Sequence, residues 1–364
     1  MPQPSFPTDC ESLTADWLTA ALGGQENLGA RITGFSADRV GEGVGFMGVV
    51  SRLSLAYDRE APAAPRSVIA KFPSPDPGAR GVAATFRHYE KEARFYEQLA
   101  AHSPVHAPRA YYQAFDPQSG DFALLLEDLA PRRNGDQLKG LSRAEAALAI
   151  ETLGRLQACW WETPELDAVP WLPAFSDPSM LVLEAVFQQC WGPYQAFLGD
   201  KLPPPMRAVG DRLATRIQKI LHRLSESPCT LVHGDFRADN FFFGDDGASL
   251  AVVDWQIVLK GRGAFDLAYL LTGNLSVEDR RDGEAELVRL YAETLRANGV
   301  AGYGFDEAWR DYRLCAVFGW IWPVVAIGSL DPSNARGLAF FFEWSRRVCT
   351  AIEDLEAARL LEAF

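Results

Sequence analysis

Residues 231–240 read Leu231-Val232-His233-Gly234-Asp235-Phe236-Arg237-Ala238-Asp239-Asn240, and residues 252–256 read Val252-Val253-Asp254-Trp255-Gln256. In both segments a short apolar run typical of a buried strand leads into a carboxylate. Taken alone, each of Asp235, Asn240 and Asp254 fits an ordinary turn former or a solvated strand end. Two acids and an amide together at strand ends and turns indicate a reaction site.

This combination of side chains matches the needs of phosphoryl transfer. That reaction requires a carboxylate to orient an attacking hydroxyl and accept its proton, and hard oxygen ligands to hold magnesium on the phosphates. An H-x-D-x-x-x-x-N loop followed by a strand-terminal acid supplies both, and kinase catalytic loops have the same spacing from Asp to Asn. The pattern predicts a kinase that uses ATP and Mg²⁺.

A kinase also needs a phosphate-covering loop, a lysine on the following strands and a glutamate on the adjacent helix. Residues 40–48 are glycine-rich, so their backbone N–H groups can approach phosphates without obstruction. Lys71 ends an apolar strand, and Glu92 and Glu90 on the next helix are its available partners. Each feature alone also fits a plain hairpin, a surface lysine or a solvated helix face.

The glycines from Gly43 to Gly48 also match the G-x-G-x-x-G pattern of a dinucleotide site. Such a site needs a helix to begin at the glycines, whereas residues 49–55 alternate as a strand does. A hairpin is therefore favoured over a dinucleotide turn, and an NAD(P)-dependent oxidoreductase is the weakest alternative.

The order of predicted elements indicates an α+β chain with two lobes. In the first third, Thr8 and Glu11 have the spacing of a capping box ahead of a short helix that ends at Gly23. Ser142 and Glu145 form a second capping box, from which the chain becomes mainly helical. The polar segment 130–140 separates the two parts. We therefore expect an N-lobe at 1–129 that binds nucleotide and a C-lobe at 130–364 with the catalytic loop, the metal site and a helical acceptor-binding region.

The remaining elements follow from hydrophobic periodicity. Strands are expected at 30–36, 49–57, 68–72, 110–115, 122–129, 230–232 and 250–253. Helices are expected at 86–101, 142–161, 180–198, 206–225, 277–298 and 307–327.

Composition excludes several classes of function. The chain has 364 residues, 48% of them hydrophobic, and a formal net charge of −13, which disfavours nucleic acid as a partner. Its six cysteines form no CxxC pair, so neither a zinc site nor a disulfide framework is expected. The N-terminus lacks signal-peptide features, and the longest apolar stretch contains Pro323 and is too short for a bilayer. We expect a cytoplasmic protein that does not bind membranes.

These motifs, in this order, resemble the aminoglycoside phosphotransferase and choline kinase superfamily, and within it the ecdysteroid kinase-like (CHK kinase-like) branch. The resemblance covers roughly residues 30–300. The segments that carry it are Gly43-Val44-Gly45-Phe46-Met47-Gly48, Glu92-Ala93-Arg94-Phe95-Tyr96, His233-Gly234-Asp235 through Asn240, Asp254-Trp255-Gln256 and Gly263-Ala264-Phe265-Asp266-Leu267-Ala268.

The resemblance implies a bilobal protein-kinase-like fold, with an antiparallel sheet plus helices in the N-lobe and a larger, mainly helical C-lobe. It implies that Asp235 is the catalytic carboxylate, that His233 braces the catalytic loop, and that Asn240 and Asp254 are magnesium ligands. Asp266 is implied to be a buried acid that orders the loop, although a helix N-cap is compatible with its position.

On the nucleotide side, the resemblance implies that Lys71 contacts the ATP phosphates and pairs with Glu92 rather than Glu90. Backbone groups near Glu127 to Leu129 are implied to meet the adenine. The nucleotide-binding set is Gly43, Gly45, Gly48, Lys71, Glu92, Glu127 and Leu129.

One departure from the family concerns the acceptor side. Many relatives carry a histidine where this chain has Gln157, which puts any acceptor role of that position in doubt. The region 180–225 resembles the insertion that shapes the acceptor pocket in small-molecule kinases. Six tryptophans in the helical part could line such a pocket, although core packing is the more common role of each: Trp160, Trp161, Trp191, Trp320, Trp322 and Trp344.

Small molecules are favoured over proteins as acceptors. Only eleven residues separate Asp254 from Asp266, and no D-F-G or A-P-E marker is present. We therefore expect an ATP-dependent phosphotransferase whose acceptor is an alcohol group of a small molecule. The alternative is a catalytically idle nucleotide-binding module. Acceptor identity, ATP versus GTP, and monomer versus homodimer stay open.

Overall fold

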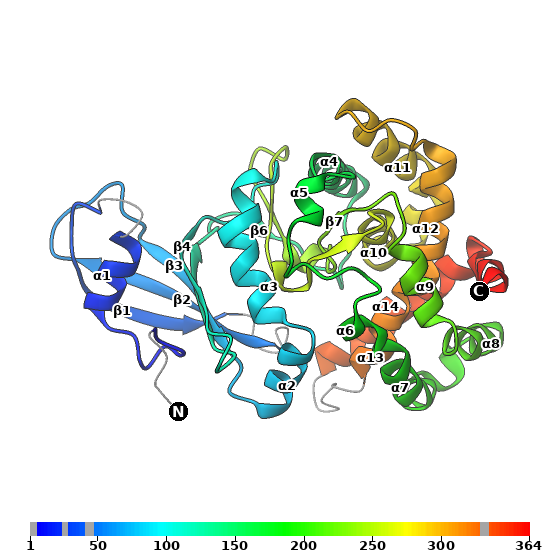
Figure 1. Ribbon diagram of the computed structural model, residues 1–364, viewed down its shortest axis with the longest axis horizontal. Helices are drawn as coiled ribbons and strands as arrows, with labels where there is room; N and C mark the ends of the chain where they lie inside the picture. The colour runs from blue at the N-terminus through cyan, green and yellow to red at the C-terminus, as the bar shows by residue number, and fades with distance from the viewer. Residues whose placement is uncertain (1–5, 24–27, 41–46, 328–334) are drawn as a thin grey trace. The chain divides into compact units, whose positions relative to one another are not determined.

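The computed structural model describes residues 6–23, 28–40, 47–327 and 335–364. The chain forms two compact units (Figure 1). The first comprises Met1–Arg132 and Val252–Ile257, and the second comprises Arg133–Ala251 and Val258–Phe364. The sequence places one boundary after residue 129, whereas here the boundary follows Arg132 and a short later segment joins the first unit. The functions expected of the two parts stay predictions.

The first unit is built on a five-stranded antiparallel sheet in the order β1-β2-β3-β5-β4. The five strands expected in this part of the chain are confirmed, with shifted ends. They are β1 (Ile32–Arg39), β2 (Gly48–Tyr57), β3 (Ser67–Pro73), β4 (Ala110–Phe115) and β5 (Phe122–Glu127).

Helices cover both faces of strand β5. Successive side chains of a strand face opposite sides of a sheet, so Ala123 and Leu125 share one face. Both belong to the core cluster that Leu18 and Leu22 of helix α1 (Ala15–Gly23) complete. On the other face, Tyr89 of helix α3 (His88–Arg94) stacks on Phe122 with ring centroids 4.3 Å apart. Strand β5 is therefore buried on both sides.

Helix α1 begins later than its expected capping box. The Thr14 hydroxyl accepts a hydrogen bond from the Trp17 N–H and begins the helix, so the cap expected at Thr8 is wrong. Upstream, Asp9 accepts the Ser12 N–H in a turn. Ser and Thr side chains bind backbone N–H groups in turns as readily as at helix N-caps, so the spacing alone did not locate the cap.

The predicted helix 86–101 is divided in the structure. It comprises α3 (His88–Arg94), a π-helical turn (Phe95–Leu99) and a short 3₁₀ turn (Ala100–His102). The preceding helix α2 (Pro77–Thr85) was not predicted, although Asp76 caps it and proline occupies its first position.

The second unit is mainly helical. Its helices are α4 (Arg143–Cys159), α5 (Pro164–Asp167), α6 (Pro178–Leu181), α7 (Leu183–Leu198), α8 (Pro204–Leu213), α9 (Ile217–Leu224), α10 (Ala264–Asn274), α11 (Val277–Ala297), α12 (Phe305–Gly319), α13 (Ile321–Ile327) and α14 (Ala335–Asp354), with a closing 3₁₀ turn at Ala357–Ala363. The capping box of Ser142 and Glu145 is present at the start of α4 and confirms that prediction.

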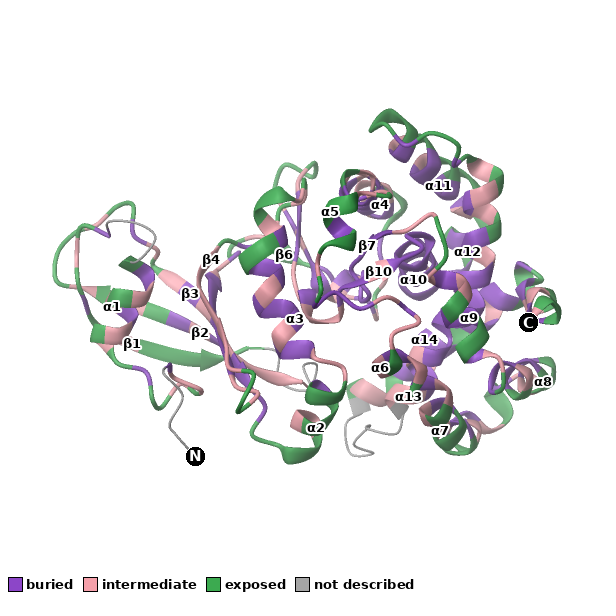
Figure 2. Cartoon of the chain, viewed as in Figure 1, coloured by how far each residue is buried: buried purple, intermediate pink, exposed green. Residues whose placement is uncertain are grey.

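Helix α10 forms the centre of the second unit. Every one of its residues is buried, as Figure 2 makes visible, and it packs against α4, α11, α12 and α14. Because α10 is buried on every side it has no amphipathic period, and it was not among the helices predicted from periodicity.

Short strands frame the segment 233–240. Strand β7 (Thr230–Val232) pairs antiparallel with β10 (Leu259–Gly261) and ends directly before the segment. Strand β8 (Phe241–Phe243) begins directly after it, between β6 (Arg133–Asn134) and β9 (Leu250–Val252). The segment is thus anchored at both ends by strands.

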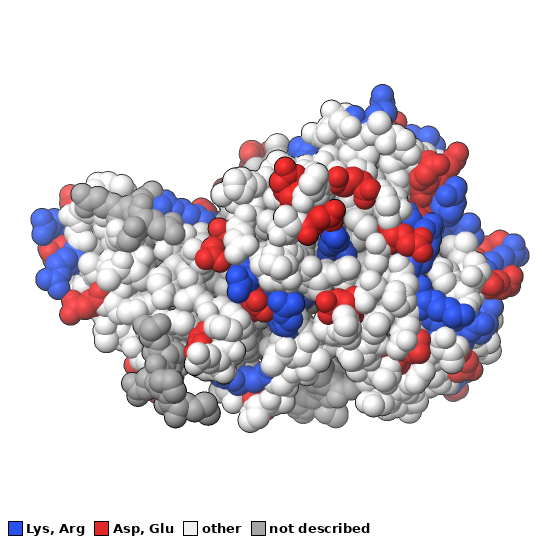
Figure 3. Space-filling view, viewed as in Figure 1, with Lys and Arg blue, Asp and Glu red and all other residues white. Residues whose placement is uncertain are grey.

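Basic and acidic side chains are interspersed over the face seen in Figure 3. In the described part of the chain, every helix is too short or too polar to span a bilayer.

The contact between α7 and α8 allows a test of the packing. A Cβ added at Gly210 would lie 2.1 Å from a ring carbon of Trp191, so Gly210→Ala must displace the indole. We expect a loss of roughly 1–3 kcal/mol in the free energy of unfolding, measured by urea denaturation.

The matched control is Gly192→Ala, in the interior of α7, where an added Cβ meets nothing within 4 Å. That change should be neutral or stabilise by roughly 0.5–1 kcal/mol. Equal stability effects of the two variants would contradict this account of the α7–α8 contact.

Candidate active site

The loop after β7 turns sharply at glycine and returns onto a histidine. Gly234 has a φ of 87°, a left-handed conformation that favours glycine over other residues. The His233 ring is buried, and its Nδ1 accepts the Asp235 N–H at 3.2 Å. The turn thereby directs the Asp235 side chain out of the strand, and His233 contacts the backbone that carries it.

Asp266 holds the start of this loop from inside α10. Its Oδ2 accepts the His233 N–H at 2.8 Å, and its Oδ1 accepts the Gly234 N–H at 2.9 Å. Burial raises the pKa of Asp266 to about 7, against the lowering effect of these hydrogen bonds. The N-cap of α10 is Gly263, so Asp266 lies in the first turn of the helix and is not the cap that the sequence allowed.

Gln157 lies behind Asp266 in the core. Its Nε2 donates to the Asp266 carboxylate at 3.2 Å and to the Gly263 carbonyl at 3.1 Å, and its Oε1 accepts from the Tyr291 hydroxyl. An added Cβ at Gly263 would lie 2.5 Å from this Oε1, so the amide needs glycine there. Position 157, whose acceptor role the sequence left in doubt, therefore supports Asp266.

The Asp235 carboxylate is held through one of its oxygens. Oδ2 accepts hydrogen bonds from Asn240 Nδ2 at 2.9 Å and from Arg237 Nε at 3.0 Å. Asn240 Nδ2 also donates to the Asp235 carbonyl at 2.8 Å. Because the amide nitrogen of Asn240 is engaged by Asp235, its Oδ1 is the atom turned away and can serve as a hard oxygen ligand.

Two residues next to Asp235 were not predicted from the sequence. Arg237 bridges Asp235 and Asp239, and the Tyr269 hydroxyl from α10 hydrogen-bonds to the Asp235 carboxylate. Burial raises the pKa of Tyr269 well above its usual value, and the nearby Asp235 adds to the effect. A basic residue two positions after the acid could have indicated Arg237, whereas nothing in the sequence signals Tyr269.

The end of the loop is held by two further contacts. The Ala238 N–H donates to Asn274 Oδ1 at 2.8 Å, and the Gln137 N–H donates to Asp239 Oδ1 at 2.9 Å. Asn274 is the last residue of α10, so that helix contacts the loop at both ends.

A second group of predicted residues gathers in the first unit. Lys71 Nζ donates to Glu92 Oε1 at 2.6 Å and to Asp254 Oδ1 at 3.0 Å. Glu90 instead pairs with Arg87 and Arg94. Burial acts to lower the pKa of Lys71, but the Asp254 and Glu92 carboxylates outweigh it and raise that pKa above its usual value. Lys71 therefore stays an ammonium ion.

Asp254 has an unusual backbone conformation. Its φ of 69° lies in the left-handed region, which non-glycine residues seldom adopt outside constrained sites. Gln256 Nε2 donates to its second oxygen at 3.1 Å. The next residue, Trp255, is fully buried and stacks on Phe95 with centroids 3.9 Å apart, which fastens this segment to the first unit.

The remaining nucleotide-side predictions have mixed outcomes. Gly43 and Gly45 lie outside the described residues. Gly48 is the first residue of β2, and an added Cβ would lie 2.8 Å from the Phe72 carbonyl of the neighbouring β3. Because the chain continues from Gly48 as a strand antiparallel to β1, the strand-turn-helix of a dinucleotide site is excluded.

Glu127 and Leu129 are the last two residues of the predicted nucleotide-binding set. The Glu127 N–H donates to the Arg109 carbonyl at 2.8 Å, and its carboxylate accepts the Arg109 N–H at 3.1 Å. Leu129 is buried, and its carbonyl accepts the Arg132 N–H at 2.8 Å. A contact between adenine and this segment stays a prediction.

Among residues 6–23, 28–40, 47–327 and 335–364, no set of three or more His, Cys, Asp and Glu side chains is grouped so as to hold a metal ion. The hard oxygens that suit Mg²⁺ are the Asp254 carboxylate and the Asn240 amide oxygen.

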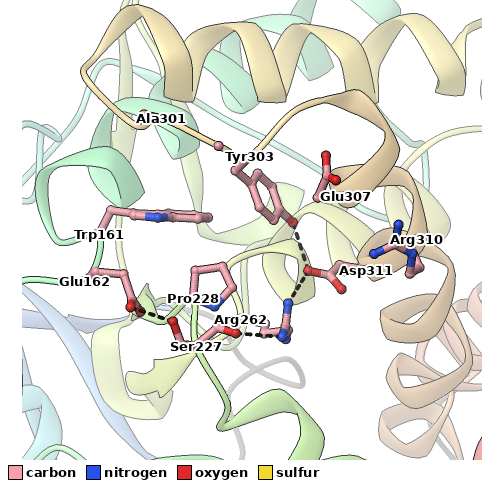
Figure 4. A pocket seen from close by; sticks show the side chains of 11 residues that line it. Trp161, Glu162, Ser227, Pro228, Arg262, Ala301, Tyr303, Glu307, Arg310 and Asp311 are labelled. Carbon is pink, nitrogen blue, oxygen red and sulfur yellow. Dashed lines mark hydrogen bonds and ion pairs between the residues drawn. The ribbon is translucent and has the colours of Figure 1, made fainter.

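A cavity of about 290 Å³ in the second unit lies at the other end of β7 from the loop (Figure 4). Ser227 and Pro228, which precede β7, line it together with Trp161. Among its lining residues, Arg262 pairs with Asp311 at 2.7 Å. None of the predicted catalytic, nucleotide-binding or metal-binding residues lines this cavity.

Most of the tryptophans proposed for an acceptor pocket serve the helical core. Trp160, Trp191, Trp320 and Trp344 are buried. Trp161 lines the cavity of Figure 4, where its ring meets the Tyr303 ring edge-on at 4.9 Å.

Two solved structures share this fold. The GDP complex of aminoglycoside 2'-phosphotransferase-IIIa superposes with a TM-score of 0.51 at 14% identity, and covers 95% of this chain and 100% of that one. The amicoumacin kinase hAmiN, in complex with AMP-PNP and Ca²⁺, gives a TM-score of 0.53 at 16% identity and covers 86% and 90%. At these identities the likeness shows the fold alone. The predicted α+β, protein-kinase-like fold is confirmed.

Sequence comparison identifies the family. An uncharacterized kinase-like protein of Caenorhabditis elegans is 24% identical over 242 residues, and the match covers 61% of this chain and 61% of that protein. The match therefore spans less than two thirds of that relative's length. The ecdysteroid kinase-like family model matches residues 42–299, which is more than half of the chain. The chain therefore belongs to the ecdysteroid kinase-like family, a family of small-molecule kinase-like proteins.

Proposed function

We propose that this protein transfers the γ-phosphoryl group of ATP to a hydroxyl group of a small molecule. The observation that carries the proposal is the fixed Asp235 carboxylate, with Oδ2 bound by Arg237 and Asn240. We propose that this carboxylate accepts the proton of an acceptor hydroxyl through Oδ1, which receives neither of these two hydrogen bonds. As the hydroxyl oxygen bonds to the γ-phosphorus, its proton moves to Asp235, and the bond from the γ-phosphorus to the departing ADP oxygen breaks.

The Lys71 cluster, formed by Lys71, Glu92 and Asp254, supports a nucleotide-binding role for the first unit. An ammonium held by two carboxylates is positioned and stays charged, so it can meet phosphate oxygens without reorganisation. We propose that Lys71 contacts the ATP phosphates and that Glu92 keeps it in place.

The chemistry of the available donors also suits magnesium. We propose that Asn240 and Asp254 are the ligands from this chain, because both supply oxygen and Mg²⁺ prefers oxygen ligands. When bound, Mg²⁺ would neutralise charge on the β- and γ-phosphates. The solved neighbours include one complex with AMP-PNP and one with GDP, so competition between ATP and GTP would establish which nucleotide this protein uses.

The acceptor is sought by measuring ATP consumption across aminoglycosides, macrolides, choline-like amines, sterols, phenols and sugars. Phosphorylation of one of these classes, verified by mass spectrometry, is the expected result. Stabilisation of the protein by Mg·ATP with no phosphorylated acceptor would instead indicate an idle nucleotide-binding module.

Removing the proposed base should abolish transfer but not binding. Asp235→Ala is expected to reduce kcat by roughly 10²–10⁴-fold, because no group remains to accept the hydroxyl proton. Calorimetry should give a Kd for Mg·AMP-PNP close to the wild-type value. Asp245→Ala, at an exposed turn, is the matched control and should keep wild-type turnover. Full turnover in Asp235→Ala would refute the assignment of the base.

Removing the proposed metal ligand should weaken binding only when metal is present. For Asp254→Asn we expect a Kd for AMP-PNP about tenfold higher with Mg²⁺, and little change in EDTA, since Glu92 still holds the Lys71 ammonium. The measurement is calorimetric titration in both buffers. An unchanged dependence of Kd on Mg²⁺ would remove Asp254 from the ligand set.

Asp266 makes stability depend on pH with a defined sign. Its folded pKa of about 7 lies above the unfolded value of about 3.9, so its stabilising contribution is full below about pH 4 and is lost as pH rises through 7. The free energy of unfolding of wild type relative to Asp266→Asn should therefore fall between about pH 5 and 7, by at most about 1.4 kcal/mol per unit. Urea denaturation of both proteins measures it, and a constant difference would contradict a raised pKa.

A further inference from the structure

We propose that Arg237 is a positioning residue that holds the base Asp235 in its reactive orientation. This inference rests on the proposed function. Arg237 Nε donates to Asp235 Oδ2 at 3.0 Å, and its Nη1 donates to Asp239. One planar guanidinium therefore joins two carboxylates of the same loop and fixes which oxygen of Asp235 is occupied.

The planar shape of the guanidinium is what the geometry requires. Nε and Nη1 are rigidly spaced, so placing one on Asp239 determines where the other meets Asp235. A lysine ammonium is a point charge on a flexible stem and lacks this fixed spacing. Arginine at position 237 therefore sets the direction of the Asp235 carboxylate and does more than add a positive charge nearby.

Arg237 is itself firmly held. Its Nη1 also donates to Gln137 Oε1 at 3.2 Å, and the Gln137 N–H binds the other oxygen of Asp239 at 2.9 Å. Arg347 donates to the Gln137 carbonyl at 2.7 Å, which connects the group to α14. The Arg237 side chain is only 15% exposed, so few alternative orientations are open to it.

The neighbouring carboxylates keep the Arg237 guanidinium charged. Burial acts to lower the pKa of Arg237, but the Asp235 and Asp239 carboxylates outweigh it and raise that pKa above its usual value. The guanidinium thus remains a cation and a hydrogen-bond donor at every accessible pH. Without it, the Asp235 carboxylate would keep the Asn240 and Tyr269 hydrogen bonds but lose its charged donor at Oδ2, and it could rotate about its terminal bond more easily.

The test is chemical rescue. Arg237→Ala and Arg237→Lys are assayed with the acceptor that the screen identifies. If the wild-type protein shows no turnover, that result counts against the proposed function and not against this inference. We expect kcat of Arg237→Ala to fall roughly 100-fold, because the Asp235 carboxylate loses its reactive orientation. The KM for ATP should change little, because nucleotide binding does not depend on that orientation. Millimolar methylguanidinium should restore part of kcat. Arg237→Lys should recover little.

A matched control separates positioning from folding. Arg280 on α11 is a buried arginine, 1% exposed, that pairs with Glu284 and Asp354. Arg280→Ala should lower Tm, keep kcat and show no response to methylguanidinium. The inference is overturned if Arg237→Ala keeps kcat within twofold of wild type, or if it loses activity only in proportion to folded protein and methylguanidinium has no effect.

Discussion

The hydrogen bonds from the His233 and Gly234 N–H groups to the buried Asp266 carboxylate are the contacts on which the loop depends. Burying a carboxylate is unfavourable, and its pKa of about 7 reflects that penalty. The two amides offset part of it, and Gln157 contributes a third hydrogen bond. Because Asp266 lies on a helix that is buried along its whole length, it cannot shift without disturbing the core.

Helix α10 holds this loop at two points. Asp266 in its first turn binds the start of the loop, and Asn274 at its end binds Ala238. The two residues are eight positions apart, about 12 Å along the helix at the usual rise per residue, and that length is rigid. Asp235 and Arg237 lie on the span between these two anchors, and Asn240 follows two residues after the second. Their mutual distances therefore follow from the helix as much as from the loop.

The Lys71 cluster depends on different physics. Here charge dominates, since one ammonium lies between two carboxylates from separate segments of the chain. Backbone strain at Asp254 accompanies it, and the stacking of Trp255 on Phe95 stabilises the strained segment. A rigid aromatic contact thus places an acid whose own conformation is unfavourable, as is common where a side chain has a functional role.

Local pattern was enough for much of this protein. Alternation and short apolar runs predicted strands β1 to β5, and the spacing of acids, amide and lysine predicted site roles for Asp235, Asn240, Asp254 and Lys71, because these signals depend on neighbours in the chain. Helix α10 gave no amphipathic period because it is buried on every side. The choice of Glu92 over Glu90 was implied by resemblance alone, and the link from Gln157 to Asp266 joins residues more than a hundred positions apart. Only the tertiary structure decided such pairings, since hydrogen bonds and ion pairs depend on distances in space that sequence separation does not determine.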